Sequence, residues 1–133
     1  IAEYGLAWHL SQIAGRATAL DLLLTARVLL SEEMHALGLV NRVVAAPEVM
    51  NESMALAMAL AANSSPASMA TIKRQVHDAS TTSVQEAMVE ADKLMYESLE
   101  GADVREGIQS FLDKRTVSFA PLGHGTTFAW MED

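Results

Sequence analysis

The sequence predicts a mostly helical chain with almost no β-sheet of its own. Apolar residues recur at helical spacing through most of its length, and Ser, Pro and Gly stand where helices start and stop. Only one short segment, residues 39–44, is rich in β-branched residues. Each amphipathic helix has to bury its apolar face on something. A self-contained bundle meets that need, and so does a sheet that this chain does not contain.

The first part of the chain predicts two short helices. Residues 4–14 are compatible with a helix that Gly15 ends. The next helix, residues 16–26, has one face formed by Ala17, Leu20 and Leu24.

A third short helix and an extended segment are predicted next. Ser31 has the features of an N-cap, because two glutamates follow it in the first turn. Gly38 stands where a helix commonly ends in the left-handed conformation. Residues 39–44 then favour an extended, β-prone conformation.

From Pro47 onward the sequence predicts helices almost throughout. A helix over 47–62 is followed by a break at 64–66, where Ser and Pro begin the next helix. Ser83 and Glu86 have the spacing of a capping box. Asp103 and Glu106 repeat this pattern. The segment after Pro121 has no periodicity, so we expect 121–133 to be a loose tail.

Composition excludes several classes of protein. The 133 residues carry a formal net charge of −8, which argues against a nucleic-acid backbone as the main partner. Without cysteine the chain has no disulfide, no Cys-based zinc site and no thiol nucleophile. No apolar run reaches the roughly 18 residues needed to span a bilayer, and the first residues lack signal-peptide features. We therefore expect a soluble, cytoplasmic protein without a membrane span.

The sequence predicts neither a metal site nor a phosphate-binding loop. Metal-ligand spacing is absent among the four histidines, which are His9, His35, His77 and His124. His35 is expected to be exposed. The glycines at 123 and 125 lack the strand before and the helix after that a phosphate loop needs.

Five segments, taken in order, resemble the C-terminal half of the crotonase superfamily, the enoyl-CoA hydratase/isomerase family. They are EYGLAWHL at 3–10, ALDLLLTAR at 19–27, SEEMHALGLVNRVV at 31–44, Ser65-Pro66 together with Lys73, and EGIQSFLDKR at 106–115 followed by Phe119. Each segment alone is weakly specific, but their order is characteristic. The resemblance covers residues 1–120, as part of one domain.

The resemblance implies an α/β spiral ββα fold in the parent protein, of which this chain is the mostly helical C-terminal part. It implies an acyl-CoA substrate, a homotrimer or hexamer, a place in fatty-acid metabolism, and no cofactor beyond the coenzyme A carried by the substrate. In the family, two backbone N–H groups stabilise an enolate and carboxylates move protons or activate water. The N-terminal half that supplies the oxyanion hole has no match in these residues, so we expect the chain alone to be inactive.

Three positions depart from the family pattern. Met34 stands where Ala is common, residues 11–12 (Ser-Gln) where Pro-Arg is common, and Ala26 where Gly usually precedes the Arg. We interpret the changes at 11–12 and 26 as packing or turn changes without chemistry.

Glu3 is the candidate catalytic residue, because by resemblance it stands where family isomerases carry their acid/base carboxylate. Leu6 and Trp8 are candidate apolar walls of the acyl pocket. The alternative for Glu3 is an acid stabilised by a helix N-terminus, and for Trp8 a place in the core.

Phe111 and Lys114 match the family positions that contact the coenzyme A of a neighbouring subunit. The alternatives are burial of Phe111 on an apolar helix face and pairing of Lys114 with the helix dipole. Two functions therefore stay open: an enoyl-CoA hydratase or isomerase, and a non-catalytic helical oligomerisation or interaction module derived from that family.

Overall fold

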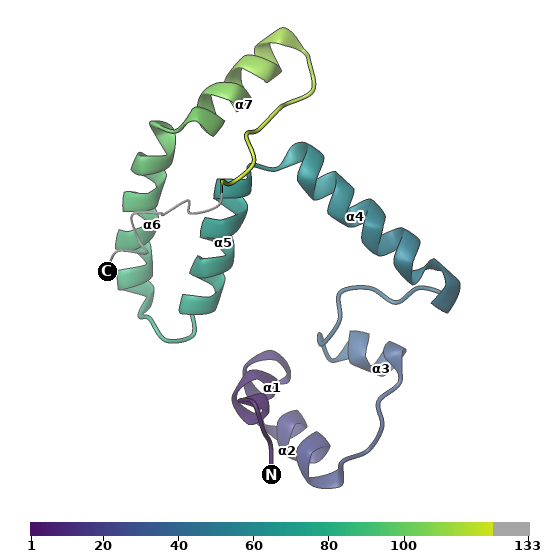
Figure 1. The fold of residues 1–133 in the computed structure, drawn as a ribbon. Coiled ribbons are helices and arrows are strands. Elements are labelled where there is room, and N and C mark those ends of the chain that lie inside the picture. The colour runs from purple at the N-terminus through teal and green to yellow at the C-terminus, as the bar shows by residue number, and fades with distance from the viewer. Residues whose placement is uncertain (124–133) are drawn as a thin grey trace. The chain divides into compact units, whose positions relative to one another are not determined.

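The computed structural model describes residues 1–123, and no strand occurs among them (Figure 1). Two compact units divide the chain, one from Ile1 to Met50 and one from Asn51 onward. The helical elements are α1 (Leu6–Ala14), α2 (Arg16–Thr25), α3 (Ser31–Ala36), the 3₁₀-helix η1 (Ala46–Glu48), α4 (Val49–Asn63), α5 (Pro66–Asp78), α6 (Val84–Leu99) and α7 (Ala102–Asp113). The predicted mostly helical fold is confirmed.

In the first unit, α1 and α2 pack against each other around a small core. Gly15 joins them with φ 79°, a left-handed value that a glycine adopts without strain. Leu10, Ala19 and Leu22 are the buried apolar residues of the described chain. Around them pack Ala14, Leu23, Leu29, Leu37 and Leu39. The predicted break at Gly15 is confirmed.

The N-cap of α3 lies one residue earlier than the sequence predicts. Leu30 is the N-cap, and Ser31 is the first helical residue, so the predicted Ser31 cap is wrong. The acidic first turn is held by Arg27, whose guanidinium donates to both carboxylate oxygens of Glu33 (2.9 and 2.6 Å) and to Asp21 (3.1 Å). The hydrogen bonds that Glu33 accepts from Arg27 lower the pKa of its carboxyl. The ion pairs, rather than a serine cap, hold the start of this helix.

Gly38 ends α3 in the left-handed conformation, as predicted, with φ 74°. The Leu39 N–H donates to the Met34 carbonyl (2.9 Å) and the Gly38 N–H to the His35 carbonyl (3.0 Å). This pattern is the Schellman motif. His35 is exposed, as expected, and its Nδ1 lies 3.1 Å from the Val40 carbonyl.

Residues 39–44 form no strand, which corrects the β-prone prediction. A strand needs a second strand for its backbone hydrogen bonds, and the described part of the chain offers none.

In the second unit, α5 and α6 form an antiparallel pair joined by a short turn (Figure 1). The predicted helix start at 64–66 and the predicted capping box are confirmed there. The Ser65 side chain accepts from the Ser68 N–H (3.0 Å), and Ser83 with Glu86 forms a reciprocal capping box (2.9 and 3.2 Å). Arg74 on α5 binds Glu90 on α6, which connects the two helices.

The predicted cap at Asp103 is wrong. Gly101 is the N-cap of α7, and Asp103 lies in its first turn. The Asp103 carboxylate accepts a hydrogen bond from the hydroxyl of Ser65, 38 residues earlier. The carboxylate that local spacing assigned to a helix cap is therefore hydrogen-bonded to a residue distant in the sequence.

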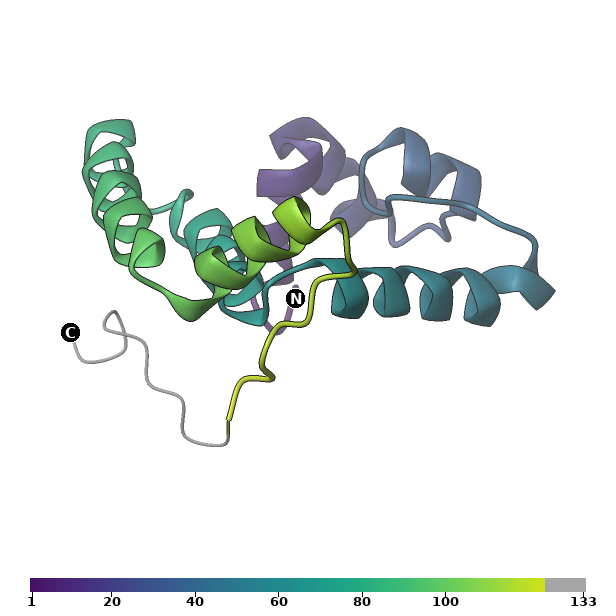
Figure 2. The same cartoon turned by 90° about the horizontal axis from the view of Figure 1, so that it is seen from above.

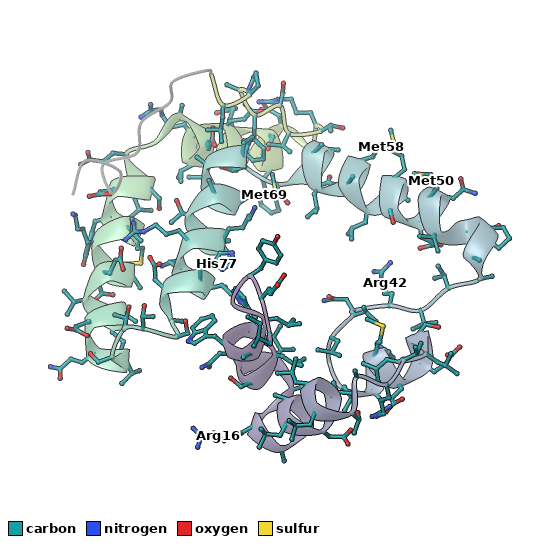
Figure 3. All side chains as sticks on the ribbon, turned by 60° about the horizontal axis from the view of Figure 1, so that its bottom comes forward. Arg16, Arg42, Met50, Met58, Met69 and His77 are labelled. Atoms are coloured by element: carbon teal, nitrogen blue, oxygen red, sulfur yellow. The ribbon has the colours of Figure 1, made fainter. Side chains whose placement is uncertain are left out.

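All fifteen residues of α4 are exposed, although nine in succession from Met54 to Ala62 are apolar. Met50 and Met58 are among its exposed side chains (Figure 3). A helix that is apolar on all sides is normally buried, so α4 lacks the covering that its composition calls for within the described residues.

Most of the predicted loose tail, residues 124–133, lies outside the described residues. Among the helices that the structure describes, none is both long and apolar enough to cross a membrane.

Candidate functional site

Glu3 lies in the turn that leads into α1. Its carbonyl accepts from the Leu6 N–H (3.0 Å), and both Tyr4 and Gly5 have left-handed backbone angles. Gly5 is the N-cap of α1, and no side chain caps that helix. The Glu3 side chain is exposed, so it is accessible from solvent in this unit.

Leu6 and Trp8 follow within the first turn of α1, and each is about half exposed. The Trp8 ring meets the ring of His9 edge-on, with centroids 4.9 Å apart and an interplanar angle of 87°. With 45% of its surface exposed, Trp8 is not a core residue of the described chain. Glu3, Leu6 and Trp8 are thus gathered at one end of one helix.

Phe111 and Lys114 lie at the opposite end of the chain, where α7 ends. Phe111 is 82% exposed, so the alternative interpretation, burial on an apolar helix face, does not hold among the described residues. Lys114 is the C-cap and has a left-handed φ of 53°, and its N–H donates to the carbonyls of Ser110 and Phe111. An aromatic ring and an ammonium group therefore stand exposed within three residues of each other.

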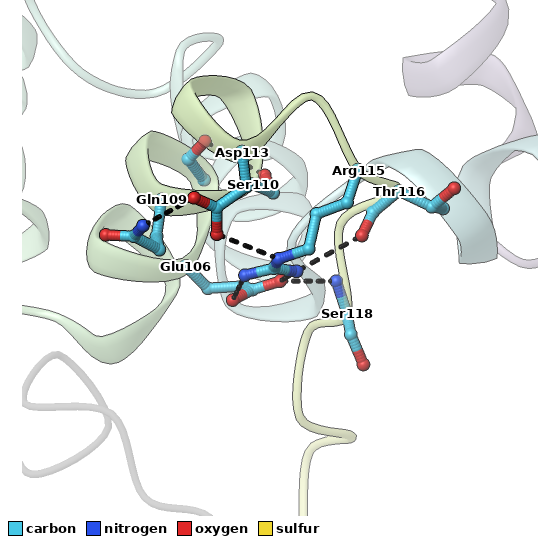
Figure 4. A network of polar contacts seen from close by, with 8 residues as sticks. Glu106, Gln109, Ser110, Asp113, Arg115, Thr116 and Ser118 are labelled. Atoms are coloured by element: carbon cyan, nitrogen blue, oxygen red, sulfur yellow. Dashed lines mark hydrogen bonds and ion pairs between the residues drawn. The ribbon is translucent and has the colours of Figure 1, made fainter.

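A polar network fixes the chain immediately after these two residues (Figure 4). The Arg115 guanidinium donates to both carboxylate oxygens of Glu106 (2.6 and 2.8 Å), and the Ser118 N–H donates to Glu106 (2.7 Å). Arg115, followed by the Ser118 N–H, lowers the pKa of the Glu106 carboxyl to about 2. The spacing of residues 103–106 predicts that Glu106 belongs to a helix cap. The sequence signal for the observed pair is instead the opposite charges of Glu106, within α7, and Arg115, just after its end.

The predicted site residues fall into two groups, one in each unit: Glu3, Leu6 and Trp8 in the first, Phe111 and Lys114 in the second. Within each group the residues are neighbours in the chain. The described residues contain no cluster of three His, Cys, Asp or Glu side chains that could hold a metal ion.

Sequence reasoning missed a hollow of about 650 Å³ in the second unit. It lies between α5 and α6 and is bounded at one end by the start of α7 and by residues 120–122. Its polar lining includes Ser65 and Asp103, and its apolar lining includes Ile72, Leu94 and Met95. Four separate segments form this wall, so no local motif could have indicated it.

Comparison with known proteins gives one consistent family. The model of the family described as Enoyl-CoA hydratase/isomerase matches residues 1–121. A probable enoyl-CoA hydratase of Mycobacterium tuberculosis is 32% identical over 111 residues, which are 84% of this chain and 43% of that protein. The 1,2-epoxyphenylacetyl-CoA isomerase of Escherichia coli is 33% identical over 122 residues, which are 90% of this chain and 45% of that protein.

Solved structures agree with the sequence comparison. A probable enoyl-CoA hydratase/isomerase from Mycobacterium abscessus matches with a TM-score of 0.83 and 29% identity, over 87% of this chain and 47% of its own. An enoyl-CoA hydratase from Polaromonas sp. JS666 matches with a TM-score of 0.80 and 30% identity, over 87% and 45%. The chain thus spans about half the length of the relatives it matches, and the predicted crotonase-like fold class is confirmed.

Proposed function

Because this chain belongs to the enoyl-CoA hydratase/isomerase family, we propose that the complete protein adds water to an enoyl-CoA thioester or shifts its double bond. The observation that carries the proposal is the family match over residues 1–121. Relatives named as hydratases and as an isomerase both lie within this range of similarity, so both reactions stay within the proposal.

The chain acts together with the remaining half of the same fold. Support comes from α4, whose apolar residues are exposed on all sides. Removing apolar surface from water stabilises a protein by roughly 25 cal/mol per Å². This free energy favours packing of such a helix onto a partner surface. The covering element is a sheet-bearing N-terminal half, which also supplies the two backbone N–H groups of the oxyanion hole. The assembly is a homotrimer or hexamer.

In this mechanism the thioester carbonyl gains negative charge as the enolate forms, and fixed N–H donors stabilise that charge in a water-poor site. Glu3 carries the proton between substrate positions as a general acid and base, which contributes about 10²–10⁴-fold to the rate. Leu6 and Trp8, on the first turn of α1 beside it, form apolar walls for the acyl chain.

Phe111 and Lys114 bind the coenzyme A part of the substrate. Their exposure at the end of α7 supports this role. The exposed ring stacks on the adenine, and the ammonium group contacts phosphate as a point charge.

A non-catalytic interaction module is the second candidate. The observation favouring it is that the chain is acidic and that its described residues are mostly helical. Reading the DNA upstream of Ile1 separates the two candidates: an in-frame, family-like segment with a Gly-rich turn supports the enzyme, and a start codon at Ile1 supports the module.

Activity provides the direct test. We expect the purified 133-residue chain alone to leave crotonyl-CoA unhydrated, and the protein with its N-terminal half to consume enoyl-CoA. Hydration by the chain alone would contradict the requirement for a second half. Absence of both hydratase and isomerase activity in the complete, folded protein would refute the enzyme proposal.

A further inference from the structure

His9 on α1 lies against two parts of the candidate site. Its ring centroid is 4.9 Å from that of Trp8, and the two ring planes meet at 87°. Its backbone N–H donates to the Gly5 carbonyl (3.1 Å), and a Cβ placed on Gly5 would lie 3.7 Å from Cδ2 of the same imidazole. The His9 ring therefore covers the backbone of Gly5 and contacts the Trp8 indole at the same time.

This contact is unusual for two neighbouring residues of a helix. Side chains one position apart point roughly 100° away from each other and do not face one another. His9 leans back over Gly5, four residues earlier, as helical side chains do toward the N-terminus. For the two rings to meet edge-on, the Trp8 indole has to turn toward His9. Edge-on aromatic pairs are stabilised beyond the burial of their surface, so this pair favours one orientation of the indole.

The packing of the first unit leaves the Trp8 indole to this contact. Trp8 is 45% exposed, and in the described chain it belongs neither to the buried core nor to the apolar residues packed around that core. The turn that carries Glu3 leads directly into α1 (purple, beside the label N in Figures 1 and 2). His9 thus connects the backbone of this turn to the ring that follows it on the helix.

We propose that His9 is a positioning residue of the acyl site, which holds the Trp8 indole against the turn that carries Glu3. His9 acts through Trp8, because an indole already held in one orientation loses less conformational freedom when the acyl chain binds. This inference rests on the proposed function, which takes Trp8 as a wall of the acyl pocket. It assigns His9 an effect on substrate binding, whereas Glu3 acts on proton transfer.

Near-ultraviolet circular dichroism tests the ring contact in the 133-residue chain. Trp130→Phe leaves Trp8 as the only tryptophan of the sequence. We expect His9→Ala to weaken the indole band strongly, because a freely rotating ring gives little signal. His9→Phe should retain the band, since a phenyl ring makes the same edge-on contact. Gln12→Ala, at another exposed position of α1, is the matched control and should leave the band unchanged.

Binding of butyryl-CoA to the complete protein tests the positioning role. This saturated thioester has no double bond to hydrate or shift, so its Kd reports binding without turnover. We expect His9→Ala to raise Kd by about 3–10-fold, the range that loss of one aromatic pair allows. The number of binding sites and kcat for an enoyl-CoA should stay within about twofold of the parent, because the lost interaction is made equally before and in the transition state. His9→Phe and Gln12→Ala should keep the Kd of the parent.

The positioning role and the enzyme proposal fail in different ways. In His9→Ala, an unchanged indole band, an unchanged Kd, or a loss confined to kcat or to the number of binding sites would overturn the positioning role, even in an active enzyme. A complete protein that binds butyryl-CoA in a His9-dependent way but turns over no enoyl-CoA would refute the enzyme proposal and support the role of His9.

Discussion

Replacing Ser65 with alanine removes two hydrogen bonds that start two different helices. Its hydroxyl oxygen accepts from the Ser68 N–H as the N-cap of α5, and its O–H donates to Asp103 in the first turn of α7. Loss of an N-cap costs about 1 kcal/mol. Loss of a donor to a carboxylate costs about 1.5–3 kcal/mol when buried, and about 1 kcal/mol here, because Asp103 is half-buried and water can partly replace the serine.

The expected total is a loss of about 2 kcal/mol in the free energy of unfolding, or about 8–16 °C in Tm for a unit of roughly 80 residues. Urea unfolding followed by far-UV circular dichroism measures the loss. Ser65→Thr keeps the hydroxyl and is the control, expected to stay within about 0.5 kcal/mol of the parent. Protection of the Ser68 amide against hydrogen exchange should fall with Ser65→Ala and persist with Ser65→Thr.

A double-mutant cycle of Ser65→Ala with Asp103→Ala isolates the contact between α5 and α7. We expect a coupling energy of about 1 kcal/mol, with the remaining loss assigned to the cap. A total loss below about 0.5 kcal/mol, or a coupling energy of zero, would refute this account of how α5 and α7 are joined.

Three other changes test separate features. Ala26→Gly should stabilise the chain by about 0.5–1 kcal/mol, because Ala26 has a left-handed φ of 49° that a glycine adopts without its Cβ strain; an unchanged or lower urea midpoint would contradict this. Glu106 has a pKa lowered from 4.5 to about 2, so its contribution to stability is present above about pH 4.5 and is lost as pH falls toward 2. Glu106→Gln should therefore flatten the stability–pH profile in that window, and a profile with the parent's slope would count against the Arg115 pairing. In the complete protein, Glu3→Gln should lower kcat far more than it raises KM, since proton transfer is expressed in the transition state; an unchanged kcat would remove Glu3 from the mechanism.

Local sequence patterns predicted the features that depend on neighbouring residues alone. Ser65, Gly15 and the capping box of Ser83 with Glu86 all behave as the spacing indicates, because each needs only groups within four residues. The same patterns failed wherever a distant group competed. The carboxylate of Asp103 bonds to the Ser65 hydroxyl, although the sequence favoured a local cap.

Periodicity predicts which residues share a helix face, but not what covers that face. Phe111 illustrates this limit, since its spacing allowed burial as an alternative to a binding role and its ring is exposed. Residues 39–44 illustrate it for a sheet, because β-propensity cannot supply a second strand. For the candidate site, ordered motifs indicated the family and named Glu3 and Lys114, while the hollow required four segments to be assembled in space.

The exposed helix α4 has a consequence for the life of the chain in a cell. Nine successive apolar residues on an uncovered helix resemble the surfaces that chaperones retain and that proteases select among incompletely assembled proteins. Steady-state abundance should accordingly follow the supply of whatever surface shields α4, so that surveillance of unassembled chains sets how much of this polypeptide accumulates.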